Sequence, residues 1–189
     1  MHILITGGAG YIGAITAKEC LQAGHEVLVF DHFISHDPSK LGDTPFVKGD
    51  LLDPSSLDSA LADFHPDLVM HFAAYIQMGE SVQNPEKYFK NNVEGSRNLL
   101  DTMVKAGVKK LVFASSAGVY GNPLHLPIPE DDPKNPENPY GQTKWDVEQM
   151  LEEYDLKHDL KSISIRFFNA AGATPPLGED HHDESHLIP

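Results

Sequence analysis

Six apolar segments of strand length alternate along the chain with segments whose apolar residues recur at helical spacing. They are HILIT, HEVLVF, TPFVK, DLVMHFAA, KLVFASS and SISIRFF. Consecutive parallel strands need a long crossover, usually a helix, so this alternation predicts parallel βαβ units. No solenoid repeat and no low-complexity tract argues for another architecture. We therefore expect an α/β protein with a doubly wound Rossmann fold and a mainly parallel sheet in the strand order 3-2-1-4-5-6.

Glycine and proline mark where the helices and the longest loop should lie. A first helix is expected over about 11–23, with Leu21 among its inward-facing residues and Gly24 in the position that ends helices. A long helical segment is expected over 81–106, closed by Gly107. The many prolines between 121 and 139 prevent helix formation and central-strand pairing alike. That stretch should be an ordered surface loop.

The first strand runs directly into three glycines, Gly7, Gly10 and Gly13, and the first helix starts within that run. Glycine suits this place because the turn is tight and the backbone must approach a ligand closely. The free N–H groups and the positive dipole end of the new helix would face that ligand, which makes an anion site without a basic residue. Glycines at this spacing are a weak signal alone, but strand and helix context favours a pyrophosphate.

Asp31 ends the second strand, about 20 residues beyond the glycines. A carboxylate there accepts hydrogen bonds from the hydroxyls of an adenosine ribose and repels a 2′-phosphate. The alternative is that Asp31 merely begins a loop, as aspartate often does at strand ends. Together with the strand, the glycines and the helix, it favours NAD as the cofactor, in preference to NADP.

Tyr140 and Lys144 stand four residues apart at the start of a helix, so their side chains project from one face. A nearby ammonium and an oxidised nicotinamide would both favour the phenolate of Tyr140. Ser116, at the end of a strand, would reach the same place and share a hydrogen bond with a substrate hydroxyl. The alternative is an ordinary exposed helix face. With the cofactor signature upstream, the three residues predict a proton-transfer site.

Composition limits the partners. The chain of 189 residues has a formal charge of −14, which argues against a nucleic-acid surface because phosphate backbones need a cationic face. No apolar run approaches the roughly 20 residues of a membrane span, so no membrane partner is expected. The start MHILITGG lacks the features of a secretory signal, which favours the cytoplasm. Cys20 can form no intrachain disulfide and is expected to be a buried, inert thiol.

The chain resembles the extended short-chain dehydrogenase/reductase family over essentially its whole length. The resemblance rests on several sequence blocks that occur in the family's order. They are TGGAGYIG, GDLLD, HFAA, GESVQNPEKYFKNNVEGSRNLL, LVFASSAGVYG, NPYGQTKWDVEQML, IRFFNAAGA and GEDHHDESHLIP. Within the family, the blocks are most similar to those of enzymes that epimerise UDP-sugars.

The resemblance implies a set of site residues. Ser116, Tyr140 and Lys144 fall where the family keeps its catalytic residues; all three would contact the cofactor, and Ser116 and Tyr140 would also contact the substrate. Asn169 would contact the UDP-sugar phosphates. The remaining residues implied to hold NAD are Gly7, Gly10, Tyr11, Ile12, Gly13, Asp31, His32, Phe33, Ser35, Asp50, Leu51, Phe72, Ala73, Ala74, Asn91 and Phe168.

The same resemblance implies an NAD-dependent interconversion of UDP-glucose and UDP-galactose by transient oxidation at the sugar C4, with Tyr140 as the base. Two alternatives stay open: another sugar-nucleotide enzyme of the family, such as a different epimerase, a reductase or a decarboxylase, and a catalytically silent NAD-binding module. Dehydratases of the family carry a Thr-Asp-Glu type signature where this chain has Ser-Ala-Gly at 116–118. That difference counts against dehydratase chemistry.

The C-terminal end suggests a division of the chain. We expect an NAD-binding Rossmann domain over 1–170 and, over 171–189, only the start of a truncated substrate-binding domain. The histidines and carboxylates at 181–186 could ligate zinc, but the same stretch matches a substrate-loop block of the family, so no metal is expected. The family commonly forms a homodimer through a helix pair, for which Met103, Trp145 and Met150 are the candidates here.

Overall fold

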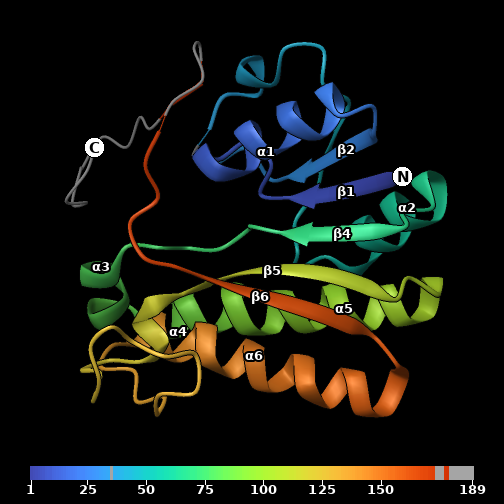
Figure 1. The fold of residues 1–189 in the computed structure, drawn as a ribbon. Coiled ribbons are helices and arrows are strands. Elements are labelled where there is room, and N and C mark those ends of the chain that lie inside the picture. The colour runs from blue at the N-terminus through green and yellow to red at the C-terminus, as the bar shows by residue number, and fades with distance from the viewer. Residues whose placement is uncertain (35, 173–176, 179–189) are drawn as a thin grey trace.

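The computed structural model describes residues 1–34, 36–172 and 177–178, and in them one six-stranded sheet forms the centre (Figure 1). The strand order is β3-β2-β1-β4-β5-β6, and every neighbouring pair is parallel. This confirms the predicted doubly wound sheet and its order. The strands are β1 His2–Thr6, β2 Glu26–Asp31, β3 Phe46–Lys48, β4 Leu68–His71, β5 Lys110–Ser116 and β6 Lys161–Phe167.

Helices connect the strands. The longer ones are α1 Tyr11–Gln22, α2 Pro54–Phe64, α5 Gly95–Ala106 and α6 Pro139–His158. Shorter segments are η1 Pro38–Leu41, α3 Met78–Gln83, α4 Pro85–Tyr88, the π-helical η2 Phe89–Glu94 and η3 Ala117–Val119. As predicted, glycines with positive φ follow α1 and α5: Gly24 has φ +80° and Gly107 has φ +76°. No helix or strand lies between Tyr120 and Asn138, which confirms the proline-rich loop.

The two faces of the sheet are covered differently. Apolar side chains of α2, α5 and α6 pack on one face in the larger core cluster, which includes Leu57, Leu99, Met103 and Leu151. On the other face, α1 packs against β1 and β2 in a smaller cluster that also includes Leu41 of η1, and Figure 1 shows α1 above those strands. Among the described residues, no helix is both long and apolar enough to cross a membrane.

The segment 81–106 is not the single helix that the sequence predicted. The structure divides it, because Asn84 leaves the helical region at φ −131° and ψ 60° and separates α3 from α4. Its successor Pro85 explains the break, since a residue before proline is disfavoured in the α conformation. The chain then passes through the π-helical turn η2 before the regular helix α5 begins. The turn η2 carries Asn91 and Asn92 at its inner side.

Four surface expectations need correction. Cys20 is half-buried against the smaller core cluster rather than fully buried. Leu21, which the helical pattern placed inward, is 36% exposed at the end of α1. Met103 and Met150 are buried members of the larger core cluster, so neither is available as a contact for a second subunit. Of the three candidate dimer residues, only the half-buried Trp145 keeps accessible surface.

Candidate functional site

A cavity of about 580 Å³ lies at the carboxyl ends of the strands. It is lined from β1, β2, β4, β5 and β6, from the start of α1, from η2 and from the first turns of α6. In open parallel sheets, ligands bind outside the carboxyl ends of the strands where the strand order reverses, and here that point is between β1 and β4. The volume falls within the range of small-molecule and cofactor sites.

Nearly all the residues predicted from the sequence gather on this cavity. The lining includes Gly7, Gly10, Tyr11, Ile12, Gly13, Asp31, His32, Asp50, Leu51, Phe72, Ala73, Ala74, Asn91, Ser116, Tyr140, Lys144, Phe168 and Asn169. Phe33 is the exception, because its ring packs on the smaller core cluster and against Phe46 instead. Ser35 lies outside the described residues.

Other lining residues were not predicted. They include His36, Gly49, Gln77, Met78, Ser115, Gly118, Phe167 and Ala170, together with Tyr75 and Ile76. Most lie within two residues of a predicted site residue in the sequence, so this proximity was the available signal. His36 differs, since it lies in a loop and reaches back over the glycine turn to within 3.7 Å of a Cβ built at Gly10. The anion site was expected to have no basic residue beside it, but the imidazole of His36 lies next to the glycine turn.

The glycine turn is closed by backbone contacts. Gly7 has φ +70°, and a Cβ at that position would lie 2.4 Å from the backbone nitrogen of Ala73. A Cβ at Gly13 would lie 2.3 Å from the carbonyl oxygen of Gly7, so α1 can pack against the turn only with glycine there. The N-cap of α1 is Gly10, which offers no side chain to the first N–H groups of the helix. Those donors and the helix dipole suit a phosphate.

Asp31 has two roles. Its carboxylate accepts hydrogen bonds from the backbone N–H of Ala9, at 3.1 Å, and of Phe33, at 2.9 Å, so it ties the glycine turn to the end of β2. Burial alone would raise the pKa of Asp31, but hydrogen bonds from His32, Phe33 and Ala9 together lower it. The carboxylate is thus held ionised, and lone pairs remain for ribose hydroxyls because each oxygen can accept more than one hydrogen bond.

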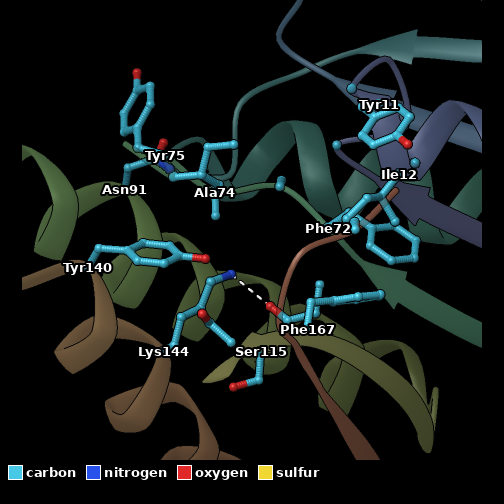
Figure 2. Close-up of a pocket in the computed structure, with 18 of the residues that line it drawn as sticks. Tyr11, Ile12, Phe72, Ala74, Tyr75, Asn91, Ser115, Tyr140, Lys144 and Phe167 are labelled. Atoms are coloured by element: carbon cyan, nitrogen blue, oxygen red, sulfur yellow. Dashed lines mark hydrogen bonds between the residues drawn. The ribbon is translucent and has the colours of Figure 1, made fainter. Parts of the chain in front are cut away.

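The proposed catalytic side chains come from two elements. Figure 2 shows Tyr140 and Lys144 extending from α6 into the same space, with Tyr11, Ile12 and Phe72 across from them. The ammonium of Lys144 donates to the carbonyl oxygen of Ala114 at 2.7 Å and lies 5.8 Å from the centre of the Tyr140 ring. Ser116 ends β5, and its hydroxyl accepts the N–H of Gly118 at 3.1 Å.

Burial dominates the acid–base properties of this pair. It raises the pKa of Tyr140, while a hydrogen bond from Ser116 acts in the opposite direction. It also lowers the pKa of Lys144 to about 7. The expectation that the ammonium would favour a phenolate is therefore not met by the protein's own groups. Any net lowering of the pKa of Tyr140 must come from a cationic nicotinamide, the second charge that the expectation invoked.

Asn92 is a supporting residue that the sequence did not reveal. It is buried, accepts the N–H of Tyr75 at 2.9 Å and donates to the carbonyl oxygen of Tyr75 at 3.0 Å. It also donates to the hydroxyl of Thr143 at 3.2 Å, and Thr143 in turn donates to the carbonyl oxygen of Tyr140. The neighbouring Asn91, predicted instead, lines the cavity. Only the tertiary fold distinguishes these two consecutive asparagines.

A metal centre has no support in the part of the chain that the structure describes. Within residues 1–34, 36–172 and 177–178, no three His, Cys, Asp or Glu side chains are grouped so that they could hold a metal ion. The histidines and carboxylates at 181–186 lie outside those residues.

Comparisons with known proteins agree with this site. Residues 3–189 match the model of the NAD dependent epimerase/dehydratase family. A UDP-glucose 4-epimerase of Halalkalibacterium halodurans is 46% identical over 100% of this chain and 57% of its own length. The structure of UDP-glucose 4-epimerase from Brucella ovis in complex with NAD aligns with a TM-score of 0.96 at 41% identity, over 98% of this chain and 58% of that one. The enzyme from Bifidobacterium longum, in complex with NAD+ and UDP, aligns with a TM-score of 0.91 at 36% identity, over 95% and 57%.

Proposed function

Because the chain belongs to the NAD dependent epimerase/dehydratase family, we propose that it forms the NAD-holding and catalytic part of an enzyme that interconverts UDP-glucose and UDP-galactose. The observation that carries the proposal is the convergence of Ser116, Tyr140 and Lys144 with the glycine turn and Asp31 on one cavity. The chain spans 57% to 58% of the length of the curated relatives it matches, so the activity is proposed for the whole protein.

Different parts of the cavity would hold different parts of NAD. The glycine turn and the uncapped start of α1 would hold the pyrophosphate, with Tyr11 and Ile12 beside it. Asp31 and His32 would contact the adenosine ribose, and Asp50 and Leu51 would flank the adenine. Further along the cavity, Phe72, Ala73, Ala74, Asn91 and Phe168 would line the path to the nicotinamide, which would lie near Tyr140. When bound, NAD supplies a reversible hydride acceptor for the sugar C4.

The chain's own residues would manage the proton. Tyr140 would take the proton of the sugar 4-hydroxyl as the C4–H bond breaks. It would return the proton after the keto sugar has rotated in the site and presented its other face. Ser116 would share a hydrogen bond with the same hydroxyl. Lys144, fixed by the carbonyl oxygen of Ala114, would lie beside the ring of Tyr140 and hold that side of the site, while the charge that favours the phenolate would come from a bound cationic nicotinamide. Asn169, at the rim of the cavity, would contact the phosphates of the UDP-sugar.

Turnover of UDP-galactose by the natural protein tests this function. We expect Tyr140→Phe to lower kcat by about 10²- to 10⁴-fold, the usual contribution of a positioned acid–base group, while NAD stays bound. A matched control is Tyr154→Phe on the same helix, which removes only the hydrogen bond from that hydroxyl to Asp101 and should leave kcat unchanged. NAD content, measured after denaturation of the purified protein, separates loss of cofactor from loss of chemistry.

A panel of sugar nucleotides decides between the alternatives. Epimerisation of UDP-glucose and UDP-galactose supports the proposal, whereas turnover only of GDP- or dTDP-sugars would assign another enzyme of the family. A protein that holds NAD but turns over no member of the panel would be a silent NAD-binding module. Each result is read from the sugar products, since the oxidation state of the cofactor is unchanged after a full epimerase cycle.

We also propose a homodimer and a cytoplasmic location for the protein. Trp145, half-buried on α6, remains the candidate subunit contact after Met103 and Met150 are placed in the core. A contact through the outer surfaces of α5 and α6 would leave the cavity open, because the cavity lies at the strand ends. Sedimentation of the natural protein at micromolar concentration measures the association, and cell fractionation measures the location.

A further inference from the structure

A buried carboxylate lies behind the proposed catalytic residues, outside the set already described. Glu148 is 6% exposed and belongs to α6, one turn after Lys144 and two turns after Tyr140. The hydroxyl of Ser115 donates to its Oε1 at 2.5 Å. Arg166 donates to both carboxylate oxygens, from Nε at 3.0 Å and from Nη2 at 2.6 Å. This is the bidentate geometry of a strong, charge-assisted pair.

The three side chains join three elements. Ser115 on β5 and Arg166 on β6 are direct partners in the parallel register, so their side chains leave the sheet on the same face. That face is covered by α6, and Glu148 bridges the two strands from above. Side chains alternate along a strand, so the next serine, Ser116, points away from Glu148. Ser115 therefore anchors α6 through Glu148, whereas the side chain of Ser116 remains available to the site.

Arg166 extends the connection to the loop before α6. Its Nη1 donates to the hydroxyl of Tyr120 at 2.6 Å and to the carbonyl oxygen of Glu130 at 2.9 Å. The turn after Ser116 is in turn packed on α6, because a Cβ at Gly141 would lie 2.7 Å from the carbonyl oxygen of Gly118. The network thus fixes β5, β6, the proline-rich loop and α6 at the place where the site residues are carried.

Stability alone is a poor account of such a network. Desolvating a carboxylate and a guanidinium costs free energy that their attraction often only offsets, and apolar residues of similar volume can stabilise a core equally well. The charged network supplies direction instead, since bidentate and hydroxyl hydrogen bonds hold the elements in one relative position. The relative position of β5 and α6 sets the distance between Ser116 and Tyr140, because β5 carries Ser116 and α6 carries Tyr140.

We propose that Glu148, held by Arg166 and Ser115, is a positioning residue that keeps Tyr140 on α6 within hydrogen-bonding reach of Ser116 on β5. The proposal rests on the proposed function, since it deepens the proton transfer assigned to Tyr140. It involves no contact between Glu148 and the substrate or cofactor. Because the hydrogen bond from Ser116 favours the phenolate, loosening the network should make Tyr140 harder to ionise.

The test is Glu148→Gln in the natural protein. The amide keeps the shape of the side chain and loses its charge, so the bidentate pair with Arg166 is broken. We expect kcat to fall about tenfold or more, with the KM for the sugar nucleotide and the NAD content unchanged. The acidic limb of the pH profile of kcat should move to higher pH, a change that a purely structural role would not cause. Ser115→Ala should shift the limb in the same direction.

Controls keep the result interpretable. Glu152→Gln removes an exposed carboxylate one turn further along α6 and should change neither kcat nor the pH profile. Glu148→Asp keeps the charge and should retain more of kcat than Glu148→Gln. Wild-type kcat and pH profile in Glu148→Gln would overturn the proposal. So would a fall in kcat that follows loss of folded, NAD-bound protein while the acidic limb stays in place.

Two further outcomes are covered. If Glu148→Gln does not fold, Ser115→Ala decides, because it removes one hydroxyl and leaves the ion pair in place. If the wild-type protein turns over no sugar nucleotide, the proposed function fails on its own. The positioning role is then read from the ultraviolet titration of tyrosinate, as the difference between each protein and the same protein with Tyr140→Phe. An unchanged pKa of Tyr140 in Glu148→Gln would reject it.

Discussion

Gly7 illustrates how the backbone conformation at one position restricts which residue can occupy it. It has a positive φ and leaves no room for a Cβ beside the backbone of Ala73, next to the paired strands β1 and β4, at the point where the strand order reverses. A left-handed φ costs an L-residue about 1–2 kcal/mol, which a protein could tolerate. A Cβ at this position would also clash with the backbone of Ala73. Rotating a side chain cannot relieve that clash, so the glycine turn itself would have to move.

A pair of variants separates the cost of a left-handed φ from the cost of a clash with the backbone. Gly24 has φ +80° and nothing within 4 Å of a built Cβ, so Gly24→Ala should lower the free energy of unfolding by only about 1–2 kcal/mol and leave NAD binding intact. Gly7→Ala should be more destabilising and should also abolish NAD retention, because the glycine turn is displaced. Urea unfolding and the NAD content of the purified variants measure both. Equal effects of the two variants would contradict this account.

At the scale of elements, α6 connects the fold to the site. Its first two turns carry Tyr140 and Lys144, and Asn138 caps it by accepting the N–H of Gly141 at 2.8 Å. Pro139 follows the cap at the first helical position, where a missing N–H costs nothing. The beginning of the helix is therefore specified locally, by Asn138 and Pro139, which directly precede Tyr140. Its position over β5 and β6 is specified at long range, by Glu148 and Lys144.

The cap gives a prediction at this scale. Asn138→Ala should lower the free energy of unfolding by about 1 kcal/mol, as loss of a cap usually does, and should also reduce kcat because the first turn of α6 becomes less ordered. The matched control is Asp53→Ala at the N-terminus of α2, where Asp53 accepts the N–H of Ser55 at 3.0 Å. It should cost a similar free energy without changing kcat. Equal losses of kcat would show that general stability, not the order of α6, is responsible.

At the scale of the whole molecule, His71 lies at the centre of the sheet. It is 2% exposed, and its two ring nitrogens are bonded to the hydroxyl of Thr6 at 2.6 Å and to that of Ser96 at 2.9 Å. The ring also stacks on Phe113. Burial lowers the pKa of His71 to about 3, and the positive charge of Lys144 acts in the same direction. The imidazole is thus a neutral connector between β1, β4 and α5.

This pKa predicts an acid sensitivity of global stability. Between about pH 6.5 and pH 3, the unfolded chain binds a proton at His71 that the folded protein does not, so stability falls as the pH falls, by up to about 1.4 kcal/mol per pH unit. His71→Gln should be less stable at pH 7 by about 1–3 kcal/mol, because buried partners lose hydrogen bonds. Its stability should then decline less steeply than that of the wild type over the same pH range.

Urea unfolding at a series of pH values measures this difference. The surface variant His158→Gln serves as the control and should retain the acid sensitivity of the wild type. Other carboxylates also titrate in this range, so the comparison uses the difference between variants at each pH. A pH dependence in His71→Gln as steep as in the wild type would contradict the role of the buried imidazole.

The sequence by itself determined the parallel sheet, its strand order, the glycine turn with Asp31, and the set of Ser116, Tyr140 and Lys144, whereas most other residues around the cavity were implied by the family resemblance. The first group could be determined because these features depend on local properties. Strand and helix periods repeat along the chain, Gly7 needs a backbone without Cβ, and residues at the carboxyl ends of parallel strands meet at one edge. Tyr140 and Lys144 share a helix, so their spacing alone placed them together.

Only the tertiary structure decided what depends on contacts between distant segments. The burial of Met103 and Met150 and the turn of Phe33 toward the core follow from packing that no local pattern records. The same holds for the pKa of Tyr140, which is governed by burial rather than by its neighbour in sequence. In the sequence, Glu148 and Arg166 look like ordinary charged residues on a helix and a strand, and nothing there indicates that they pair. The register of β5 with β6 and the docking of α6 bring them together behind the site, because long-range packing fixes both.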